Sequence, residues 1–490
     1  MKPPSSHSCA EFRCFDLEKK RMNGNILIHG ATMTLPTQTV IGDLRVRDGI
    51  IHSIAIEGTL EPLDDELFID AEGLHLMPGM IDPQCHFRDP GQPEKEDLAS
   101  GSAAAVSGGI TSFLDMPNNK PSITNLAGMQ MKLDTAAAKC VNNYGFFIGA
   151  TPNNVPELQE AVGTPEEAVS IPGICGIKIF MGSSTGTLLV NERDALNEIF
   201  SKTGGLIAVH AEDEKRLIER YETYNSRTDM AAHAQWRDDV TALLATQLAV
   251  ELAQEHGHRL HVLHLTSGIE AEWLNGITSL PSQSDNEKAI ITTETLPQHL
   301  TFDETDVERE GTRLKMNPPI RYAKDKAQLW DELKAGTIQC IATDHAPHTL
   351  EAKALGFPDA PSGMPGVETS LAVMLTHAKD GQCTIEDVVQ WMSTNVADCY
   401  NMIGKGRLEE GADGDLVLVD MNKEVTVEDE LTWTRVGWSP FRGRPLVGWA
   451  QVTIVAGTPV FERTDETGQK GTLLVEPGAT GTPIVMTPWS

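Results

Sequence analysis

Five short apolar segments of this 490-residue chain each end in, or close to, a side chain that binds metal ions or carries charge. They are Leu74–Ile81 before His86 and Arg88, Gly176–Met181 around Lys178, Leu206–His210, His261–His264, and Cys340–His348 with Asp344. Reactive side chains at the carboxyl ends of successive parallel strands are typical of a (β/α)8 barrel, where these ends meet at one rim. The sequence therefore predicts an α/β fold with a TIM barrel at its centre.

Alternation of side chains predicts which residues of the first segment face the same way. Gln84, His86 and Arg88 are two residues apart and should share one face, while Cys85 and Phe87 point away. Between the predicted strands, amphipathic stretches predict helices. In residues 239–255, for example, apolar residues recur at three- and four-residue spacing.

Composition along the chain predicts its division into parts. Residues 1–22 are polar and read as an N-terminal extension. Short alternating segments with Asp-Gly turns occur at 23–77 and again at 401–465, which predicts a small β-sandwich built from both chain ends. The barrel is expected at 78–400. Residues 466–490, rich in Gly, Thr and Pro, should form a tail over the surface.

Charge and cysteine usage exclude several classes of function. The net charge is −31, from 70 acidic and 39 basic residues, which argues against binding to nucleic acid or to an anionic membrane. Eight scattered cysteines predict reduced thiols in a cytoplasmic protein. The chain has no apolar leader at its start and no run of about 18 apolar residues, so no membrane span is expected. An anionic small-molecule substrate would need a local positive site.

Eight motifs point to a known group of enzymes, and the resemblance that they carry spans roughly residues 24–460. They are His86-Phe-Arg88, Met116-Pro-Asn118, Gly176-Ile-Lys178, Val209-His210, Leu263-His264, Met316-Asn-Pro-Pro-Ile-Arg321, Asp344-His-Ala-Pro-His348 and Gly363-Met-Pro-Gly-Val-Glu-Thr369. In these motifs the chain resembles the cyclic amidohydrolases of the amidohydrolase superfamily, and most closely the dihydroorotase family. It departs at Gln84, where the family usually has the first histidine of His-x-His. Gln298 also stands beside His299 where relatives often have two histidines.

The resemblance implies a site for one or two zinc ions. Its ligands would be His86, Lys178, His210, His264 and Asp344. A buried, protonated lysine is a poor ligand, but a neutral amine can react with carbon dioxide, and the resemblance implies that Lys178 is carboxylated in this way and bridges two metals. Asp344 would be the catalytic residue that takes a proton from the attacking water.

Other interpretations of these residues stay open at this point. Lys178 could pair with an acid at a strand end, and Asp344 could cap a helix. His210 and His264 could be ordinary buried histidines. We favour this interpretation for His261, because its odd spacing from His264 places it on the opposite face of the strand.

The resemblance also implies a substrate-binding set. Arg88, Asn118 and His348 would hold a carboxylate, with the planar arginine giving two parallel donors. Asn317 and the turn at Pro365 and Gly366 would contact the ring amide of the substrate. The alternative for Arg88 is a surface salt bridge.

These features predict a dihydroorotase that interconverts L-dihydroorotate and N-carbamoyl-L-aspartate in pyrimidine biosynthesis, as a homodimer or higher homo-oligomer. A related cyclic amidase, allantoinase or dihydropyrimidinase (hydantoinase-like), is the second interpretation. A catalytically silent partner of aspartate carbamoyltransferase is the third. Because an amide oxygen is a weaker ligand than imidazole, Gln84 predicts that one of two metal sites is impaired.

Overall fold

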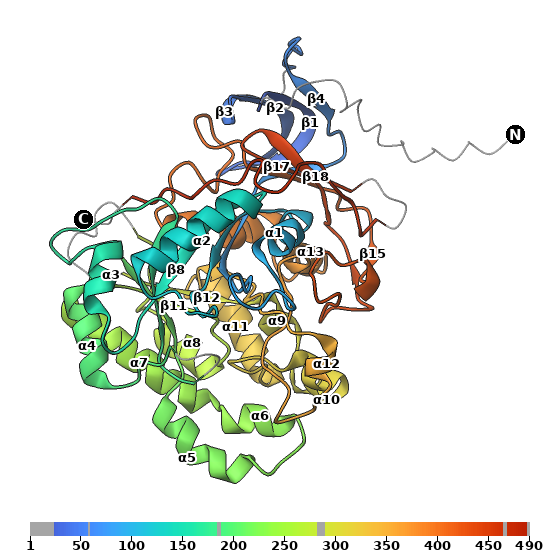
Figure 1. The fold of residues 1–490 in the computed structure, drawn as a ribbon. Coiled ribbons are helices and arrows are strands. Elements are labelled where there is room, and N and C mark those ends of the chain that lie inside the picture. Colours follow the sequence, from blue (N-terminus) through green and yellow to red (C-terminus); the bar gives the residue numbers. More distant parts are fainter. Residues whose placement is uncertain (1–23, 57–58, 184–187, 282–289, 464–467, 488–490) are drawn as a thin grey trace, which may run out of the picture.

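The computed structural model describes residues 24–56, 59–183, 188–281, 290–463 and 468–487 (Figure 1). The extension predicted at 1–22 lies outside these residues.

A barrel of eight parallel strands forms the centre of the molecule, and its strands are ordered as they occur in the sequence. The strands are β6 (Met80–Cys85), β7 (Ile110–Asp115), β8 (Asn143–Gly149), β9 (Ile174–Phe180), β10 (Leu206–His210), β11 (Arg259–Val262), β12 (Ile291–Thr295) and β13 (Cys340–Ile341). A parallel bridge from Cys85 to His345 joins the first strand to the segment after the last. The predicted (β/α)8 barrel is confirmed.

Every residue of these eight strands is buried, as expected when helices cover the outer face of a closed parallel sheet. Figure 1 shows the helices around the barrel. They are α1 (Leu98–Ser107), α2 (Leu126–Lys139), α3 (Val155–Val162), α4 (Arg193–Lys202), α5 (Glu214–Tyr224), α6 (Ala231–Trp236), α7 (Asp239–His256), α8 (Gly268–Leu274), α9 (Pro297–Thr301), α10 (Glu304–Glu310), η1 (Gly311–Leu314), α11 (Ala323–Ala335), α12 (Leu350–Lys353), α13 (Ser370–Lys379), α14 (Ile385–Val389), η2 (Gln390–Thr394) and α15 (Asn395–Cys399).

The helix predicted at 239–255 is confirmed as α7. The Asp238 side chain caps its first turn by accepting a hydrogen bond from Thr241 N–H at 3.0 Å. Gly257 ends the helix in the left-handed conformation, with φ of 64°. The local sequence therefore fixes both ends of the helix.

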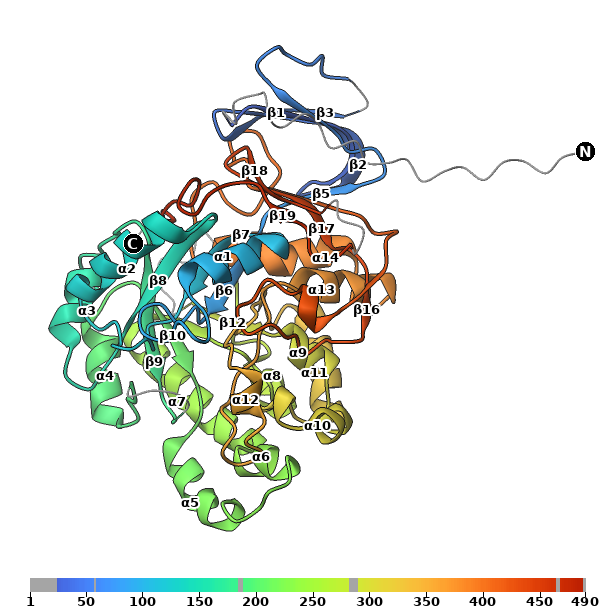
Figure 2. The same ribbon diagram turned by 45° about the vertical axis from the view of Figure 1, so that its right-hand side comes forward.

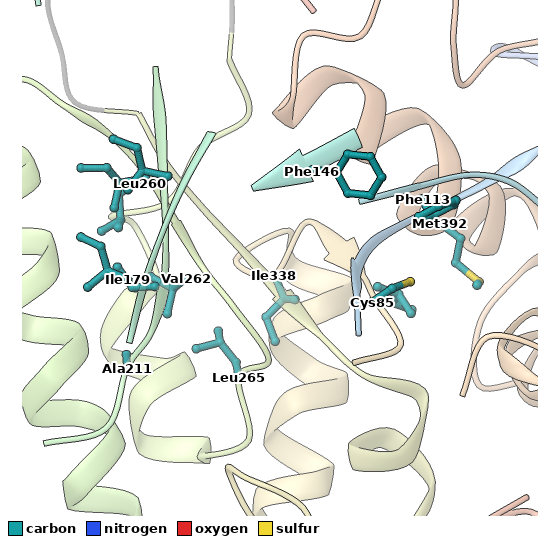
Figure 3. Close-up of a cluster of buried hydrophobic side chains, with 14 of the residues drawn as sticks. Cys85, Phe113, Phe146, Ile179, Ala211, Leu260, Val262, Leu265, Ile338 and Met392 are labelled. Atoms are coloured by element: carbon teal, nitrogen blue, oxygen red, sulfur yellow. The ribbon is translucent and has the colours of Figure 1, made fainter. Parts of the chain in front are cut away.

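The main hydrophobic core lies between the barrel strands and the helices that surround them. Figure 3 shows part of this cluster, in which Ile179, Leu260 and Val262 from the strands lie near Leu265. Burying an aliphatic side chain of this size stabilises the fold by about 1.5–3 kcal/mol. Cys85 and Phe87 also belong to this cluster.

Strands from both ends of the chain form a second sheet of nine strands. Its order is β19-β18-β17-β14-β5-β1-β2-β3, with β4 beside β1. The strands are β1 (Ile26–Thr34), β2 (Thr39–Arg47), β3 (Ile50–Ile56), β4 (Leu67–Asp70), β5 (His75–Pro78), β14 (Leu416–Val419), β17 (Ala450–Val455), β18 (Thr458–Glu462) and β19 (Thr472–Leu473). Figure 2 shows β1 and β3 above β17 to β19. Apolar residues from both parts, such as Ile28 and Ile454, share one buried cluster. The domain limits of the sequence analysis stay predictions.

Three short elements lie between β14 and β17. A two-stranded sheet pairs β15 (Val425–Thr426) with β16 (Pro445–Leu446), and the turn η3 (Asp429–Leu431) follows β15. This segment comes close to the candidate site through Trp438, as described below.

The apolar run Leu74–Ile81 was expected to form one strand. In the structure it belongs to two strands, β5 and β6. β5 pairs with β1 and β14 in the second sheet, whereas β6 begins the barrel at Met80. Gly79 separates them, and a Cβ atom there would lie 2.1 Å from Thr111 Oγ1. The chain passes from one sheet to the other at a residue where only glycine fits.

Part of the predicted tail 466–490 packs against the barrel and does not simply cover the surface. β19 pairs with β18, and Ile484 is buried. The Ile484 N–H donates to Tyr144 O at 2.9 Å, and Gly173 N–H donates to Ile484 O at 2.8 Å. The tail thus lies beside β8.

The six cysteines in the described ranges are all free thiols; Cys9 and Cys14 lie outside those ranges. No helix within the same ranges combines the length and the apolar composition needed to cross a bilayer.

Candidate active site

The predicted site residues lie at the carboxyl ends of the barrel strands. Lys178 is in the last part of β9, and His210 ends β10. His86, His264 and Asp344 follow shortly after β6, β11 and β13. The barrel therefore brings five residues from distant parts of the chain to one rim.

Three residues of this rim have a left-handed backbone, which is unfavourable for residues other than glycine. Their φ values are 60° at Arg88, 39° at His264 and 46° at Asp344. Such a conformation costs on the order of 1–3 kcal/mol per residue and persists where the surrounding structure imposes it. Next to Asp344, for instance, the Thr343 N–H donates to the buried Asp82 Oδ1 at 3.0 Å. The backbone after these strands is thus held in an unfavourable conformation, a feature common at functional sites.

His86 and Asp344 form the first pair of candidate metal ligands. His86 Nε2 lies 3.0 Å from Asp344 Oδ1. His86 Nδ1 lies 2.7 Å from Asn118 Oδ1, and because that oxygen can only accept, Nδ1 carries the proton. In the neutral tautomer, the lone pair of Nε2 would face a carboxylate oxygen, an arrangement that a cation between them would satisfy. Gln84 Nε2 donates to the same oxygen at 3.1 Å, and Gln84 Oε1 is buried without a hydrogen-bond partner in the described chain.

His210 and His264 form the second pair. His210 Nδ1 lies 3.1 Å from His264 Nε2, and His210 Nε2 lies 2.8 Å from Glu212 Oε2. Glu212 therefore fixes the proton on Nε2 and leaves Nδ1 free to bind a metal. Burial lowers the pKa of both imidazoles, which keeps them in the neutral form that ligates. Arg237 donates to Glu212, and, against the effect of burial, this guanidinium and His210 hold the pKa of Glu212 well below its usual range.

Lys178 lies near both pairs. Its side chain is buried, and its Nζ has no hydrogen-bond partner among the described residues. Burial lowers the pKa of Lys178 to about 7, against the opposing charge of Asp344. The Lys178 charge in turn contributes to the lowered pKa of His210 and of His264. An amine with such a pKa is substantially neutral near pH 7 and can react with carbon dioxide. An ion pair of Lys178 with a strand-end acid is not seen in the described chain.

The donor atoms of the candidate ligands would fit a pair of metal ions if Lys178 takes part. No group of three or more His, Cys, Asp and Glu side chains able to hold a metal is found among the described residues. The ligands form two pairs, and a carbamate on Lys178 would supply the shared oxygen donors. Two observations fit this arrangement: Lys178 Nζ has no hydrogen-bond partner in the described chain, and the ligand atoms face each other within each pair.

Arg88 and His348 form a positive site beside these residues. Arg88 is 5% exposed, so it is not a surface residue. Its Nε has no partner among the described residues, and Arg88 Nη2 lies 3.5 Å from His348 Nε2. Burial lowers the pKa of Arg88 to about 10, so the guanidinium stays charged. Burial and the charges of Arg88 and Lys95 lower the pKa of His348, which is therefore neutral. Trp438 Nε1 supports this site by donating to His348 O at 2.8 Å.

A pocket opens onto Arg88, His86 and Asp344, whereas His348 is not one of its lining residues. Its lining consists of Gln84, His86, Arg88, Phe180, His264, Asn317, Asp344, Ala346, Ser362 and Gly363. Asn317 Oδ1 is buried and has no partner in the described chain, so it is available to accept from a ring N–H. Gly366 N–H donates to His345 Nδ1 at 3.1 Å, which places the predicted Pro365–Gly366 turn behind the pocket. The residues of that segment that line the pocket are Ser362 and Gly363.

Two further predicted positions have contacts of their own. His261 lies 2.7 Å from Thr292 Oγ1 and 3.0 Å from Glu294 Oε2, and it is fully buried. Gln298 Nε2 donates to Thr343 O at 2.7 Å. Neither side chain is among the pocket-lining residues.

Sequence reasoning missed Glu212 and Arg237. Glu212 follows His210 by two residues, and this spacing was a signal that could have identified it. Arg237 lies before α7 with no motif around it, so only the fold brings it to the site. The contribution of Ser362 was likewise not visible in the sequence.

Comparison with known proteins agrees with this geometry. The sequence pattern of the Amidohydrolase family matches residues 75–460. A dihydroorotase from Methanosarcina acetivorans is 35% identical over 424 residues, covering 86% of this chain and 88% of the relative. An allantoinase from Streptomyces avermitilis is 32% identical over 423 residues, covering 85% and 89%. The structure of an L-hydantoinase (dihydropyrimidinase) from Arthrobacter aurescens superposes with a TM-score of 0.84 at 28% identity, covering 94% of this chain and 99% of that one. The chain belongs to the amidohydrolase family.

Proposed function

We propose that this protein is a metal-dependent cyclic amidohydrolase, and specifically a dihydroorotase of pyrimidine biosynthesis. The observation that supports this choice of substrate concerns Arg88. It is a buried cation whose Nε has no partner in the described chain, and it lies next to the neutral His348. Arg88 makes no direct ion pair in the described chain, and the carboxylates of Asp344, Asp115 and Glu96 act on it only from further away, so the site favours an anionic ligand. Dihydroorotate has a ring carboxylate, whereas dihydrouracil and allantoin have none.

The metal proposed here is zinc, one or two ions per subunit. His86, Asp344 and a carboxylated Lys178 would hold one ion, and Lys178, His210 and His264 the other. When bound, metal ions of this kind lower the pKa of water to about 7 and polarise the amide carbonyl. Neutral imidazoles and the unpaired Lys178 amine support this assignment.

The protein side chains then have distinct tasks. Arg88 and His348 bind the substrate carboxylate and thereby orient the ring. Asn317 Oδ1 accepts from a ring N–H, which turns the scissile amide toward Asp344. Asp344 takes the proton of the attacking water and delivers it to the ring nitrogen as the carbon–nitrogen bond breaks; the reverse sequence closes the ring.

The same proposal extends to the setting of the enzyme. It would act in the cytoplasm as a homodimer or larger homo-oligomer, with contact to aspartate carbamoyltransferase as one arrangement. A silent partner role is less well supported, because His86, Lys178, His210, His264 and Asp344 are all retained.

One experiment tests the function directly. The purified protein is assayed with L-dihydroorotate, allantoin and dihydrouracil, and zinc is measured in the same sample. We expect bound zinc and a kcat/KM for dihydroorotate well above that for either neutral ring. If the protein contains zinc and turns over only allantoin, it is an allantoinase. If it takes up no zinc and stays inactive after zinc has been added, the result supports the silent-partner role.

A further inference from the structure

Two lysines are buried behind the wall of the pocket. Lys353, the last residue of α12, is 1% exposed, and Lys315, which follows η1, is 6% exposed. Both ammonium groups donate to backbone carbonyl oxygens. A buried cation is costly unless its donors are satisfied, so the contacts of the two lysines point to a definite structural task.

Lys353 connects two segments of the chain. Its Nζ donates to Lys315 O at 2.8 Å, to Pro361 O at 3.0 Å and to Gly363 O at 2.8 Å. These three acceptors match the three N–H groups of an ammonium ion, whereas a neutral amine has only two. Although burial and the charge of Lys315 lower the pKa of Lys353, this geometry requires the charged form.

Lys315 reinforces the same connection. Its Nζ donates to Pro358 O at 2.7 Å and to Ala360 O. Its carbonyl accepts not only from Lys353 but also from Gly363 N–H at 2.9 Å. The segments 315–317 and 358–363 are therefore joined through side chains and through the backbone.

Both segments supply the wall of the pocket. Asn317 comes two residues after Lys315. Lys353 holds the carbonyls of Pro361 and Gly363, and Ser362 lies between these two residues. Gly363 has φ of 129°, and a Cβ there would lie 2.4 Å from Ala346 O, so this backbone approaches the Asp344–His348 segment closely. α12 itself begins two residues after His348. Lys353 thus links three segments that surround the substrate position.

We propose that Lys353, supported by Lys315, is a positioning residue that sets substrate affinity. It would act through Asn317 and Gly363, without touching the substrate or the metal ligands. Without the Lys353 ammonium group, the 361–363 segment would lose two hydrogen bonds. The pocket wall would then no longer be held at a fixed distance from Arg88. The kinetic part of the test rests on the proposed function, whereas the exchange part does not.

The test uses Lys353→Met, which keeps an unbranched side chain that is only one heavy atom shorter and removes all its donors. Hydrogen exchange of the full-length protein, without substrate, is compared with that of the unmodified protein. We expect peptides covering 315–321 and 358–366 to exchange about tenfold faster or more, and the β10 peptide to be unchanged. With dihydroorotate, KM should rise by about tenfold or more while kcat changes by less than about threefold and zinc content is unchanged.

Two other variants separate positioning from general stability. Lys379→Met removes an exposed lysine that pairs with Glu424 and should change neither exchange nor KM. Lys315→Met should loosen 358–361 and raise KM less than Lys353→Met does; it replaces that variant if Lys353→Met does not fold. Unchanged exchange at 358–366, or equal loss of kcat and kcat/KM with KM constant, would overturn the proposal. Faster exchange in a protein that does not use dihydroorotate would support the positioning role and refute the proposed substrate.

Discussion

Gln84 Nε2 and His86 Nε2 converge on a single oxygen, Asp344 Oδ1, at 3.1 and 3.0 Å. Gln84 therefore donates a hydrogen bond at a position where the family usually has a ligating imidazole. Its own oxygen, Oε1, is buried without a partner in the described chain. As a neutral amide it is the weaker ligand, so the ion beside His86 should be held less tightly than the ion between His210 and His264.

Removal of metal should therefore occur in two steps. We expect dialysis of the zinc-loaded protein against a mild chelator to release one ion readily and the second only at higher chelator strength. Gln84→His adds an imidazole beside His86 and should tighten the first step by roughly tenfold or more, the scale at which single ligands affect affinity. Zinc content is measured at each chelator concentration.

Gln298→His is the matched control for this variant. Gln298 is also a buried glutamine near Asp344, but it donates to the backbone at Thr343 O. The Gln298→His substitution should therefore leave both steps of zinc release unchanged. Two ions of equal affinity in the unmodified protein would show that Gln84, or another side chain, completes the site.

Asp344→Asn should abolish turnover while the fold is retained. Asp344 is assigned both as a ligand and as the carrier of a proton; a neutral amide is a weaker ligand and cannot carry the proton. We expect kcat to fall by roughly a thousandfold or more, with the circular dichroism and melting temperature close to those of the unmodified protein. Asp331→Asn, at an exposed position of α11, is the control. A rate above about a tenth of the original would remove Asp344 from the mechanism.

The barrel could be predicted from sequence because its strands are nearly uniform in character. Each is a short apolar run that ends near a polar residue, and burial on both faces selects this pattern. The boundary at Gly79 was harder to see. The residues on both sides of it are equally apolar, so the run Leu74–Ile81 gives no sign that one part pairs with β14, over 300 positions away, and the other with β7.

The candidate site was predictable where a residue type is itself unusual. A lysine such as Lys178 in an apolar strand, or Asp344 between a strand and a Pro-containing turn, stands out locally. Arg237 and Lys353 do not, since lysines and arginines are common in such positions. Their importance comes from contacts with Glu212 and with the 361–363 segment, and those contacts depend on the whole fold.

Arg88→Met should change the substrate preference. Loss of a charge-assisted contact with a carboxylate costs about 2–4 kcal/mol, so kcat/KM for dihydroorotate should fall by roughly 30- to 1,000-fold. Any turnover of dihydrouracil, which lacks the carboxylate, should be spared. Both substrates are assayed with Arg88→Met and with the control Arg309→Met, an exposed arginine of α10 that is 58% exposed. Equal losses on the two substrates would contradict the assignment of Arg88.

Glu368 gives the protein a pH-dependent stability that is separate from catalysis. The carboxyl group is buried, and burial raises its pKa from 4.5 to about 7, although Trp433 N–H donates to Oε2 at 2.8 Å. The other oxygen, Oε1, has no partner in the described chain. The folded protein therefore keeps this proton between about pH 4.5 and 7, while the unfolded chain loses it. Raising the pH through this range favours the unfolded chain.

Glu368→Gln should remove this dependence, because glutamine has nearly the shape of the protonated acid and never ionises. The quantity to follow is the free energy of unfolding of the variant minus that of the unmodified protein. This difference should rise by about 3 kcal/mol between pH 4.5 and 8, because each unit of the pKa shift corresponds to about 1.4 kcal/mol. Urea unfolding at several pH values measures it, with exposed Glu430→Gln as the control. A difference between variant and unmodified protein that stays constant with pH would mean that Glu368 ionises as freely in the folded protein as in the unfolded chain.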